Sequence, residues 1–202
     1  MSQHNNKAFQ AISLERALKA YSEGLVFVAF DLETTGLDPH VDEIVEIGAV
    51  KFDIKGPIAR FSTLINPGIP MPAEAGSVNN ITDEMLRKKP SLDEVLPDFI
   101  HFIQGAVLAV HNASFDCGFI NDKLKKRWEK ANKAWTPPYP SLPNFIADTL
   151  VFSREVFPGL RSYSLQNLAL DLHIPSRDAH RAEDDARLCT ELLLRCLGAQ
   201  KT

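Results

Sequence analysis

Two carboxylates, Asp31 and Glu33, end an apolar run that begins at Phe27 (FVAFDLETTG). On a β-strand, the i, i+2 spacing puts both side chains on one face of the sheet. Two like charges buried side by side need a counter-charge, and a divalent cation with oxygen ligands can supply it. A strand that simply ends in a polar turn explains the same residues, so the rest of the chain has to decide between the two interpretations.

A third acid, Asp116, follows the short apolar run AVLAV at 106–110, which is typical of a buried strand. Ligands collect at the carboxyl ends of strands in open α/β sheets. If this strand pairs beside the strand of Asp31, the two carboxylates converge at one edge. Capping of the following helix is the simpler role for an acid at this place, and taken alone it explains Asp116 equally well.

A fourth acid, Asp185, stands at the start of the last expected helix. Helical spacing from Asp185 leads to Cys189, Leu192 and Cys196, which form an apolar stripe. Spacing from Asp184 leads to a mostly polar row, so we expect Asp184 to complement the helix dipole at the surface. An inward carboxylate needs a partner, and Asp185 is therefore the better candidate for a site.

The elements that must position these acids follow from periodicity and turn residues. We expect strands at 25–31, 44–53, 58–65, 106–110 and 145–149, and helices at 83–88, 91–104, 115–130, 164–172 and 182–197. The first three strands form an antiparallel meander, and strands then alternate with helices. The fold class is therefore α/β, with a mixed five-stranded sheet flanked by helices.

The chain of 202 residues carries a net charge of −4 and 45% hydrophobic residues, which predicts a soluble domain at 25–198 behind a helical appendage at 1–24. An amphipathic pattern at 7–23 fits either a helix packed on the domain or an arm that docks a partner. No run is long enough to span a bilayer and no signal peptide is visible, so we expect a cytoplasmic protein without a membrane partner.

The net negative charge argues against broad electrostatic binding of nucleic acid, but it leaves room for a local basic patch. The densest basic stretch lies at 123–133, and a solvated helix face and a backbone-binding patch both explain it. Arg161, Arg177 and Arg181 flank the acids and are better candidates for phosphate contacts. The cysteines at 117, 189 and 196 lack metal-like spacing, which indicates packed, reduced thiols.

Three motifs stand in order along the chain: FDLETTGLD at 30–38, HNASFD at 111–116 and HRAEDDA at 180–186. Together they resemble the DnaQ-like 3′→5′ exonucleases of the DEDD superfamily, in the DEDDh subgroup that has a histidine five residues before the last aspartate. The resemblance extends from about Val26 to Leu194. It implies a ribonuclease H-like fold, and the Thr34–Thr35 pair resembles the DNA proofreading branch.

The resemblance also implies roles for individual residues. Two divalent ions, Mg²⁺ or Mn²⁺, would be held by Asp31, Glu33, Asp116 and Asp185. His180 would be the general base, since an ordinary histidine pKa of about 6.5 suits that task. The terminal nucleotide would contact Thr34, Thr35, Gly36 and Leu37, and the substrate groove would be lined by Asn112 and Phe115.

Two features leave questions open. His111 ends an expected strand, and by position it rivals His180 as the base. Many relatives have a His-Gly pair before Ile-Thr-Asp, whereas this chain has Asn79–Asn80. This difference affects the local loop and any substrate preference that the loop carries.

We therefore expect a metal-dependent exonuclease that hydrolyses phosphodiester bonds at the 3′ ends of single-stranded or frayed DNA and releases nucleoside monophosphates. If the protein is an enzyme, the alternative to a DNA-directed exonuclease is an RNA-directed one. If it is not an enzyme, the alternative is a non-catalytic module that binds nucleic acid or a partner. A DNA polymerase is a candidate partner, and the sequence leaves the oligomeric state open.

Overall fold

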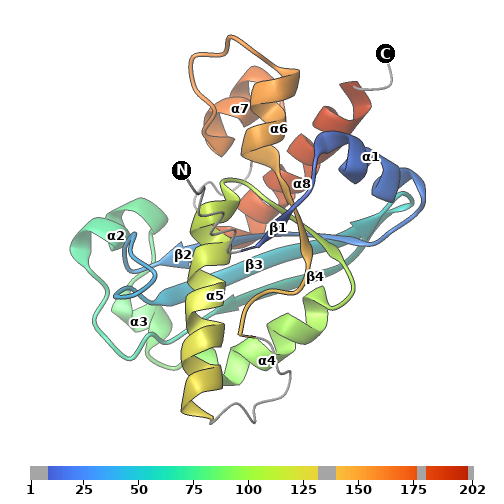
Figure 1. The fold of residues 1–202 in the computed structure, drawn as a ribbon. Helices are drawn as coiled ribbons and strands as arrows, with labels where there is room; N and C mark the ends of the chain where they lie inside the picture. The colour runs from blue at the N-terminus through green and yellow to red at the C-terminus, as the bar shows by residue number, and fades with distance from the viewer. Residues whose placement is uncertain (1–8, 132–139, 177–180, 200–202) are drawn as a thin grey trace, which may run out of the picture.

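The computed structural model describes residues 9–131, 140–176 and 181–199, and it shows one mixed sheet with helices on both faces (Figure 1). The strands are β1 (Gln10–Ala11), β2 (Phe27–Thr34), β3 (Ile44–Asp53), β4 (Gly56–Leu64), β5 (Val107–Val110) and β6 (Phe145–Asp148). The helices are α1 (Leu14–Ser22), α2 (Ala73–Asn79), α3 (Asp83–Leu86), α4 (Leu92–Ile103), α5 (Ala113–Lys130), α6 (Thr149–Val156), α7 (Leu165–Asp171) and α8 (Ala182–Ala199).

The sheet has the strand order β1-β6-β5-β2-β3-β4. Strands β2, β3 and β4 form the expected antiparallel meander, and the expected parallel pairing of β5 beside β2 is confirmed. The prediction of five strands was wrong by one, because Gln10–Ala11 pairs in parallel with Phe145–Ile146 at the edge of the sheet. A two-residue strand has no periodicity of its own to reveal it.

Helix α1 begins at Leu14, later than the expected start at residue 7, because Ser13 caps it by accepting a hydrogen bond from the backbone N–H of Arg16 at 3.3 Å. Leu14, Ala17 and Ala20 are buried, and they belong to the core that α8 shares. The amphipathic stripe of α1 is thus covered within the chain. The division into 1–24 and 25–198 stays a prediction, because residues 1–8 lie outside the described part.

Helices α2 and α6 were not expected. Helix α2 (AEAGSVN) buries only Asn79, so it has no apolar stripe that a periodicity search could find. Helix α6 follows β6 without a loop, because Asp148 both ends the strand and caps the helix by accepting from the N–H groups of Leu150 and Val151. In the part of the chain that the structure covers, every helix is too short or too polar to traverse a lipid bilayer.

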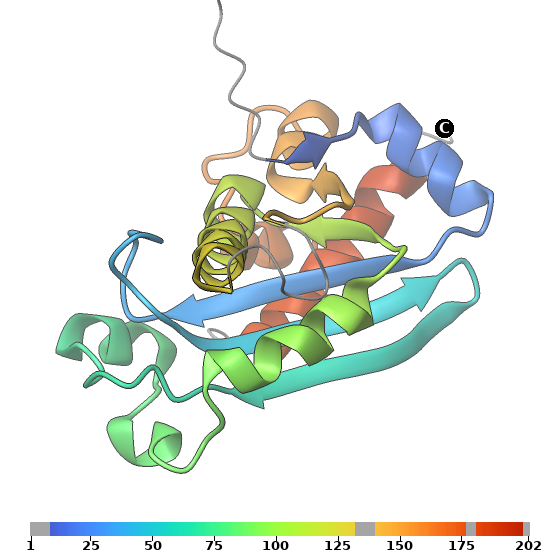
Figure 2. The same cartoon turned by 60° about the horizontal axis from the view of Figure 1, so that its bottom comes forward.

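Residues of β2 alternate between two cores, one on each face of the sheet. Val28, Phe30 and Leu32 pack in the core that includes α4 and α5, whereas Phe27 and Ala29 pack in the core that includes α1, α6, α7 and α8. Figure 2 shows α4 and α8 on opposite faces. The same alternation directs the next two odd-numbered side chains of β2 towards α8.

Candidate active site

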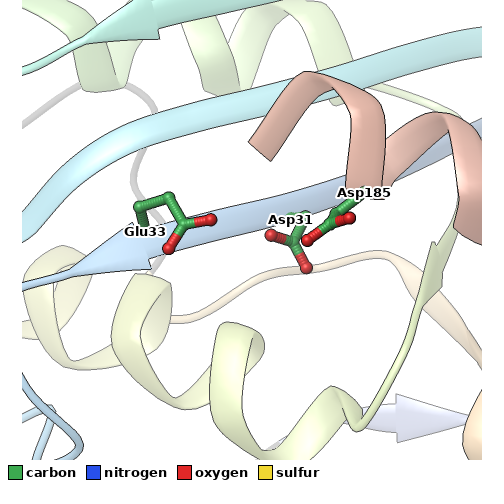
Figure 3. Close-up of side chains that lie close together, drawn as sticks. All are labelled: Asp31, Glu33 and Asp185. Atoms are coloured by element: carbon green, nitrogen blue, oxygen red, sulfur yellow. The ribbon is translucent and has the colours of Figure 1, made fainter. Parts of the chain in front are cut away.

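Those two side chains are Asp31 and Glu33, and α8 brings Asp185 to them (Figure 3). Each of the three offers a carboxylate oxygen, and these oxygens lie within 4.8 Å of one another. Asp185 is 7% exposed, as expected for the inward side of α8, and Cys189, Leu192 and Cys196 behind it are fully buried. The sequence prediction that these three acids converge is confirmed.

The close approach of α8 to the sheet depends on Gly48. This residue pairs with Asp31 across β2 and β3. A Cβ atom placed on Gly48 would lie 2.1 Å from the carbonyl carbon of Ala182 and from the backbone nitrogen of Glu183. Only a glycine therefore allows the first turn of α8 to pass this close to the strand that neighbours Asp31.

Asp116 lies in the first turn of α5 and is 3% exposed. The helix begins at Ala113, two residues before the expected start, so the N-cap interpretation of Asp116 is wrong. Its Oδ1 accepts a hydrogen bond from the backbone N–H of Leu32 at 3.2 Å. Asp116 is not a member of the three-carboxylate group, but it is bound to the strand segment between Asp31 and Glu33.

The pKa values of Asp31, Glu33 and Asp116 are all raised above their ordinary values. Burial, followed by the charges of Asp116 and Asp185, raises the pKa of Asp31 well above its ordinary value. Burial is also the main cause that raises the pKa of Glu33 to about 8 and that of Asp116 to about 8. Without a counter-charge, the group holds protons near neutral pH, and a divalent cation is the natural replacement for them.

The oxygen-only chemistry of this group fits Mg²⁺ or Mn²⁺, which prefer carboxylate ligands and need no cysteine or histidine. The spacing within 4.8 Å allows one cation to contact several of these oxygens, or two cations to share them. The residues present are therefore compatible with the divalent ions expected from the sequence.

Asp184 corrects one expectation. We expected it at the surface, but it is 9% exposed. It binds the guanidinium of Arg187 at 2.8 Å and accepts a hydrogen bond from Ser176 at 3.3 Å. Helical spacing identifies the stripe that faces the sheet, but it does not reveal the segment that covers the start of α8 from another side.

The structure adds residues that the motifs did not identify. The side-chain amide of Gln166 on α7 donates to Oδ1 of Asp185 at 2.6 Å. The amide of Asn79 donates to the backbone carbonyl of Thr34, next to Glu33, at 3.5 Å, while its oxygen accepts from the N–H of Ile81 at 3.1 Å. Neither partner has a local sequence signal, because each reaches the site from an element distant in the sequence.

His180 lies outside the described residues, so its role as the general base stays a prediction. Its rival His111 is fully engaged: Nε2 donates to the carbonyl of Tyr163 at 2.9 Å, and Nδ1 lies 3.0 Å from the hydroxyl of Thr149. Burial lowers the pKa of His111. With both ring nitrogens bound inside the fold, His111 has no free position with which to accept a proton from water at the carboxylates.

A pocket of about 400 Å³ opens beside Glu33. Among the predicted substrate contacts, it is lined by Thr34, Thr35, Gly36, Leu37 and Phe115. Leu37 is 82% exposed, so a large apolar side chain stands free at the rim. Five of the six residues predicted to contact substrate therefore line one pocket beside Glu33, and the contact itself stays a prediction.

Asn112 does not line this pocket. It precedes α5 in a left-handed conformation with φ of 67°, and its side-chain oxygen accepts a hydrogen bond from the hydroxyl of Ser114 at 2.9 Å. Its predicted contact with substrate stays a prediction.

Two lysines of the basic stretch on α5 hold the loop that follows the pocket. Lys123 is 7% exposed, and its ammonium lies 2.6 Å from the carbonyl of Asp42 and 2.9 Å from the carboxylate of Glu43. Lys126 contacts Asp122 at 2.7 Å and donates to the carbonyl of His40 at 2.9 Å. These two lysines therefore fasten the loop at 38–43 to α5, which favours a structural role over phosphate binding.

Arg181 also has a partner within the fold, the buried Glu46, and Arg177 lies outside the described residues. The phosphate contacts expected of these two arginines stay predictions.

Comparison with known proteins gives a consistent result. Residues 28–193 match the model of the RNase_T family, whose members are described as exonucleases. DNA polymerase III subunit epsilon of Treponema pallidum is 48% identical over 177 residues, which are 86% of this chain and 77% of that protein. The subunit epsilon of Aquifex aeolicus is 34% identical over 171 residues, 85% of this chain and 80% of that protein.

Longer relatives match over the same region. The PolC-type DNA polymerase III of Thermotoga maritima is 39% identical over 175 residues and 87% of this chain, but the match spans only 12% of that polymerase. The similarity therefore identifies a unit that also occurs within a larger polymerase chain.

Solved structures share the fold. Exonuclease X in complex with 5′ overhanging duplex DNA has a TM-score of 0.67 at 24% identity, over 87% of this chain and 93% of that one. The nuclease domain of 3′hExo, a DEDDh family member bound to rAMP, has a TM-score of 0.69 at 18% identity, over 88% of this chain and 94% of that one. The ribonuclease H-like fold is confirmed. Because the family model matches residues 28–193, which cover most of the chain and contain all three motifs, the chain belongs to the RNase_T exonuclease family.

Proposed function

We propose that this chain is a metal-dependent 3′→5′ exonuclease that acts on single-stranded or frayed DNA ends and releases nucleoside monophosphates. The observation that carries the proposal is the group of Asp31, Glu33 and Asp185, whose oxygens lie within 4.8 Å beside a pocket of about 400 Å³. Glu33 belongs to the carboxylate group and also lines the pocket, so a phosphate at the mouth of the pocket would lie next to the carboxylates.

The metal ligands of the proposal are Asp31, Glu33, Asp116 and Asp185, which would hold two ions of Mg²⁺ or Mn²⁺. When bound, such ions would supply positive charge that stabilises the attacking and the leaving oxygen and offsets the charge of the phosphate. The chain itself contributes the placement of the ligands. Strand β2 fixes Asp31 and Glu33, the N–H of Leu32 orients Asp116, and Gln166 orients Asp185.

His180 is the proposed base that takes the proton from the attacking water. It stands one residue before Arg181, whose carbonyl accepts the N–H of Asp185 at 3.0 Å in the first turn of α8. The engagement of His111 by Tyr163 and Thr149 removes its positional rival and supports this assignment.

The pocket is the proposed site of the terminal nucleotide. Phe115 offers a ring face for stacking, which suits a single-stranded end because every base has a π-face. Leu37 at the rim would wedge against the base. Gly36 lies so close to Asp42 that a Cβ atom would be 2.4 Å from that carboxylate, so the glycine lets the rim loop close tightly.

The relatives named DNA polymerase III subunit epsilon support a DNA substrate and association with a replicative polymerase. The same proposal assigns the chain to the cytoplasm. The family match and the carboxylate group argue against a purely non-catalytic binding module, which has no need for three converging acids.

The test compares 5′-labelled DNA and RNA of one sequence, each single- and double-stranded, with Mg²⁺ or with a chelator. Single-stranded DNA should be shortened stepwise from its 3′ end with Mg²⁺ and stay intact with chelator. Asp31→Asn and Asp185→Asn should lose more than roughly 100-fold in rate, since loss of even a supporting group at a metal site costs 10–100-fold. The control Asp171→Asn, an exposed acid at the end of α7, should match the wild type.

Full activity in purified Asp185→Asn, or unchanged activity in chelator, would contradict the proposed site. Faster degradation of RNA than of DNA would transfer the proposal to the RNA-directed alternative.

A further inference from the structure

A fifth acid, Glu46, lies next to the three-carboxylate group without belonging to it. It is on β3 directly across from Glu33 and is 2% exposed. A carboxylate buried to this degree needs a partner in the fold. Its charge reaches the site, since it is among the causes that raise the pKa of Asp31 and of Glu33.

The partner of Glu46 is the start of α8. Two guanidinium nitrogens of Arg181 donate to the two carboxylate oxygens at 3.1 and 2.6 Å, in the bidentate geometry that fixes orientation as well as distance. The backbone N–H of Ala182 donates to the same carboxylate at 3.3 Å. Glu46 therefore satisfies donors at a helix N-terminus, where an anion is favoured.

This bond is linked to the site by one turn of helix. The carbonyl of Arg181 accepts a hydrogen bond from the N–H of Asp185 at 3.0 Å. Arg181 therefore binds Glu46 through its side chain and Asp185 through its backbone. On the other side, β3 is paired residue by residue with β2, which carries Asp31 and Glu33. Glu46 thus connects the two halves of the carboxylate group.

We infer that Glu46 is a positioning residue of the active site, which holds the first turn of α8 through Arg181 and so sets the place of Asp185. Glu46 is not a catalytic residue in this account, because it does not contact the reacting groups. The inference rests on the proposed function and deepens it.

A second ion pair in the same turn provides a matched control. Arg60 on β4 contacts Glu183 at 3.1 Å, but the two side chains are 58% and 37% exposed. Exposed pairs of this kind contribute little to stability or placement. If any ion pair between the sheet and α8 were enough to position Asp185, loss of the Arg60 pair and loss of the Glu46 pair would lower kcat equally.

The experiment compares Glu46→Ala, Glu46→Gln, Arg181→Lys and the control Arg60→Gln in the full chain. Folding is checked by circular dichroism and thermal unfolding. The readouts are kcat and KM on single-stranded DNA, and calorimetric binding of Mn²⁺ without substrate. Glu46→Ala should lower kcat by roughly 10–100-fold with KM changed by less than about 3-fold, as for a misplaced catalytic group, and should weaken Mn²⁺ binding.

Glu46→Gln keeps one acceptor for the guanidinium, and Arg181→Lys keeps the charge without the fork, so both should fall between Glu46→Ala and the wild type. Arg60→Gln should behave as the wild type. Wild-type kcat and Mn²⁺ affinity in a folded Glu46→Ala or Glu46→Gln would overturn the inference, as would an equal loss in Arg60→Gln.

If Glu46→Ala does not fold, Glu46→Gln and Arg181→Lys decide the question. If the wild type hydrolyses no oligonucleotide, the proposed function fails, while the Mn²⁺ titration still tests whether Glu46 sets the carboxylate group.

Discussion

Gly48 is the point at which the addition of a single methyl group should disturb the site most directly. A Cβ atom there would lie 2.1 Å from the backbone of Ala182 and Glu183, whereas real Cβ contacts essentially never fall below 3.0 Å. Because both partners are backbone, no side chain can rotate away. In Gly48→Ala, the first turn of α8 must therefore retreat from β3 by about 1 Å.

The retreat would be transmitted to Asp185, which follows Glu183 by two residues. A displacement of about 1 Å of a catalytic group costs on the order of 100-fold in rate, so we expect kcat to fall by about that factor. Overpacking also costs about 1–3 kcal/mol of stability. For a chain of this length, that corresponds to a decrease in Tm of roughly 2–12 °C, at 2–4 °C per kcal/mol.

The assay measures kcat on single-stranded DNA and Tm in Gly48→Ala beside the control Gly118→Ala. Gly118 lies inside α5, two residues after Asp116, and a Cβ atom there meets nothing within 4 Å. Alanine in a helix interior is favoured over glycine by about 0.5–1 kcal/mol, so the control should be slightly more stable and fully active. Wild-type kcat in Gly48→Ala would refute the reasoning that the contact of α8 with Gly48 places Asp185.

Three further predictions concern the acids and their partners. The pKa of Glu33 is raised to about 8, from 4.5, and that of Asp116 to about 8. The folded chain then keeps these protons to higher pH than the unfolded chain does. The unfolding free energy of the metal-free protein should therefore fall as the pH rises from about 4.5 to about 8, as urea titrations can measure. Gln166→Ala removes the donor to Asp185 and should weaken Mn²⁺ binding by roughly 10-fold with little change in Tm, as calorimetry and thermal unfolding can show. His111→Ala removes the donor to the carbonyl of Tyr163 and one of the contacts of the buried Thr149 hydroxyl, and it should cost about 1–3 kcal/mol, while the pH–rate profile keeps its shape.

Each of these has a clear contrary result. Stability of the metal-free protein that rises over this pH range would mean that the two acids are not protonated in the fold. Unchanged Mn²⁺ affinity in Gln166→Ala would remove Gln166 from the support of Asp185. Loss of the acidic limb of the pH–rate profile in His111→Ala would restore His111 as the base.

Local spacing predicted the parts of the site that are local. The i, i+2 positions of Asp31 and Glu33 put them on one face of β2, and the apolar stripe behind Asp185 placed that residue inward. Both inferences rest on the period of a single element, which the sequence displays directly. The edge strand Gln10–Ala11 could not be predicted in this way, because it is defined by its pairing with a strand more than a hundred residues away and not by a period of its own.

The supporting contacts could not be predicted for the same reason. Glu46 is a single acid in an apolar strand sequence. Its partner Arg181 is 135 residues further along the chain, and no neighbouring residue of Glu46 indicates this pairing. Gly48 has an ordinary strand conformation, so its role is visible only when α8 is laid against it. Asp184 was misjudged because one helix turn can be buried on two sides, by the sheet and by the segment at 175–176.

Three of the residues that escaped prediction, Gly48, Glu46 and Gln166, act at the start of α8. Asp31 and Glu33 are fixed by the ladder between β2 and β3, which tolerates little movement. Asp185 comes from a separate element, so its distance from them depends on how α8 docks. Gly48 sets how near the helix comes, Glu46 holds its first residue, and Gln166 holds the carboxylate itself. The motifs therefore identify which carboxylates meet, whereas these three residues determine how closely they meet, and the rate of a metal-dependent hydrolysis depends on both.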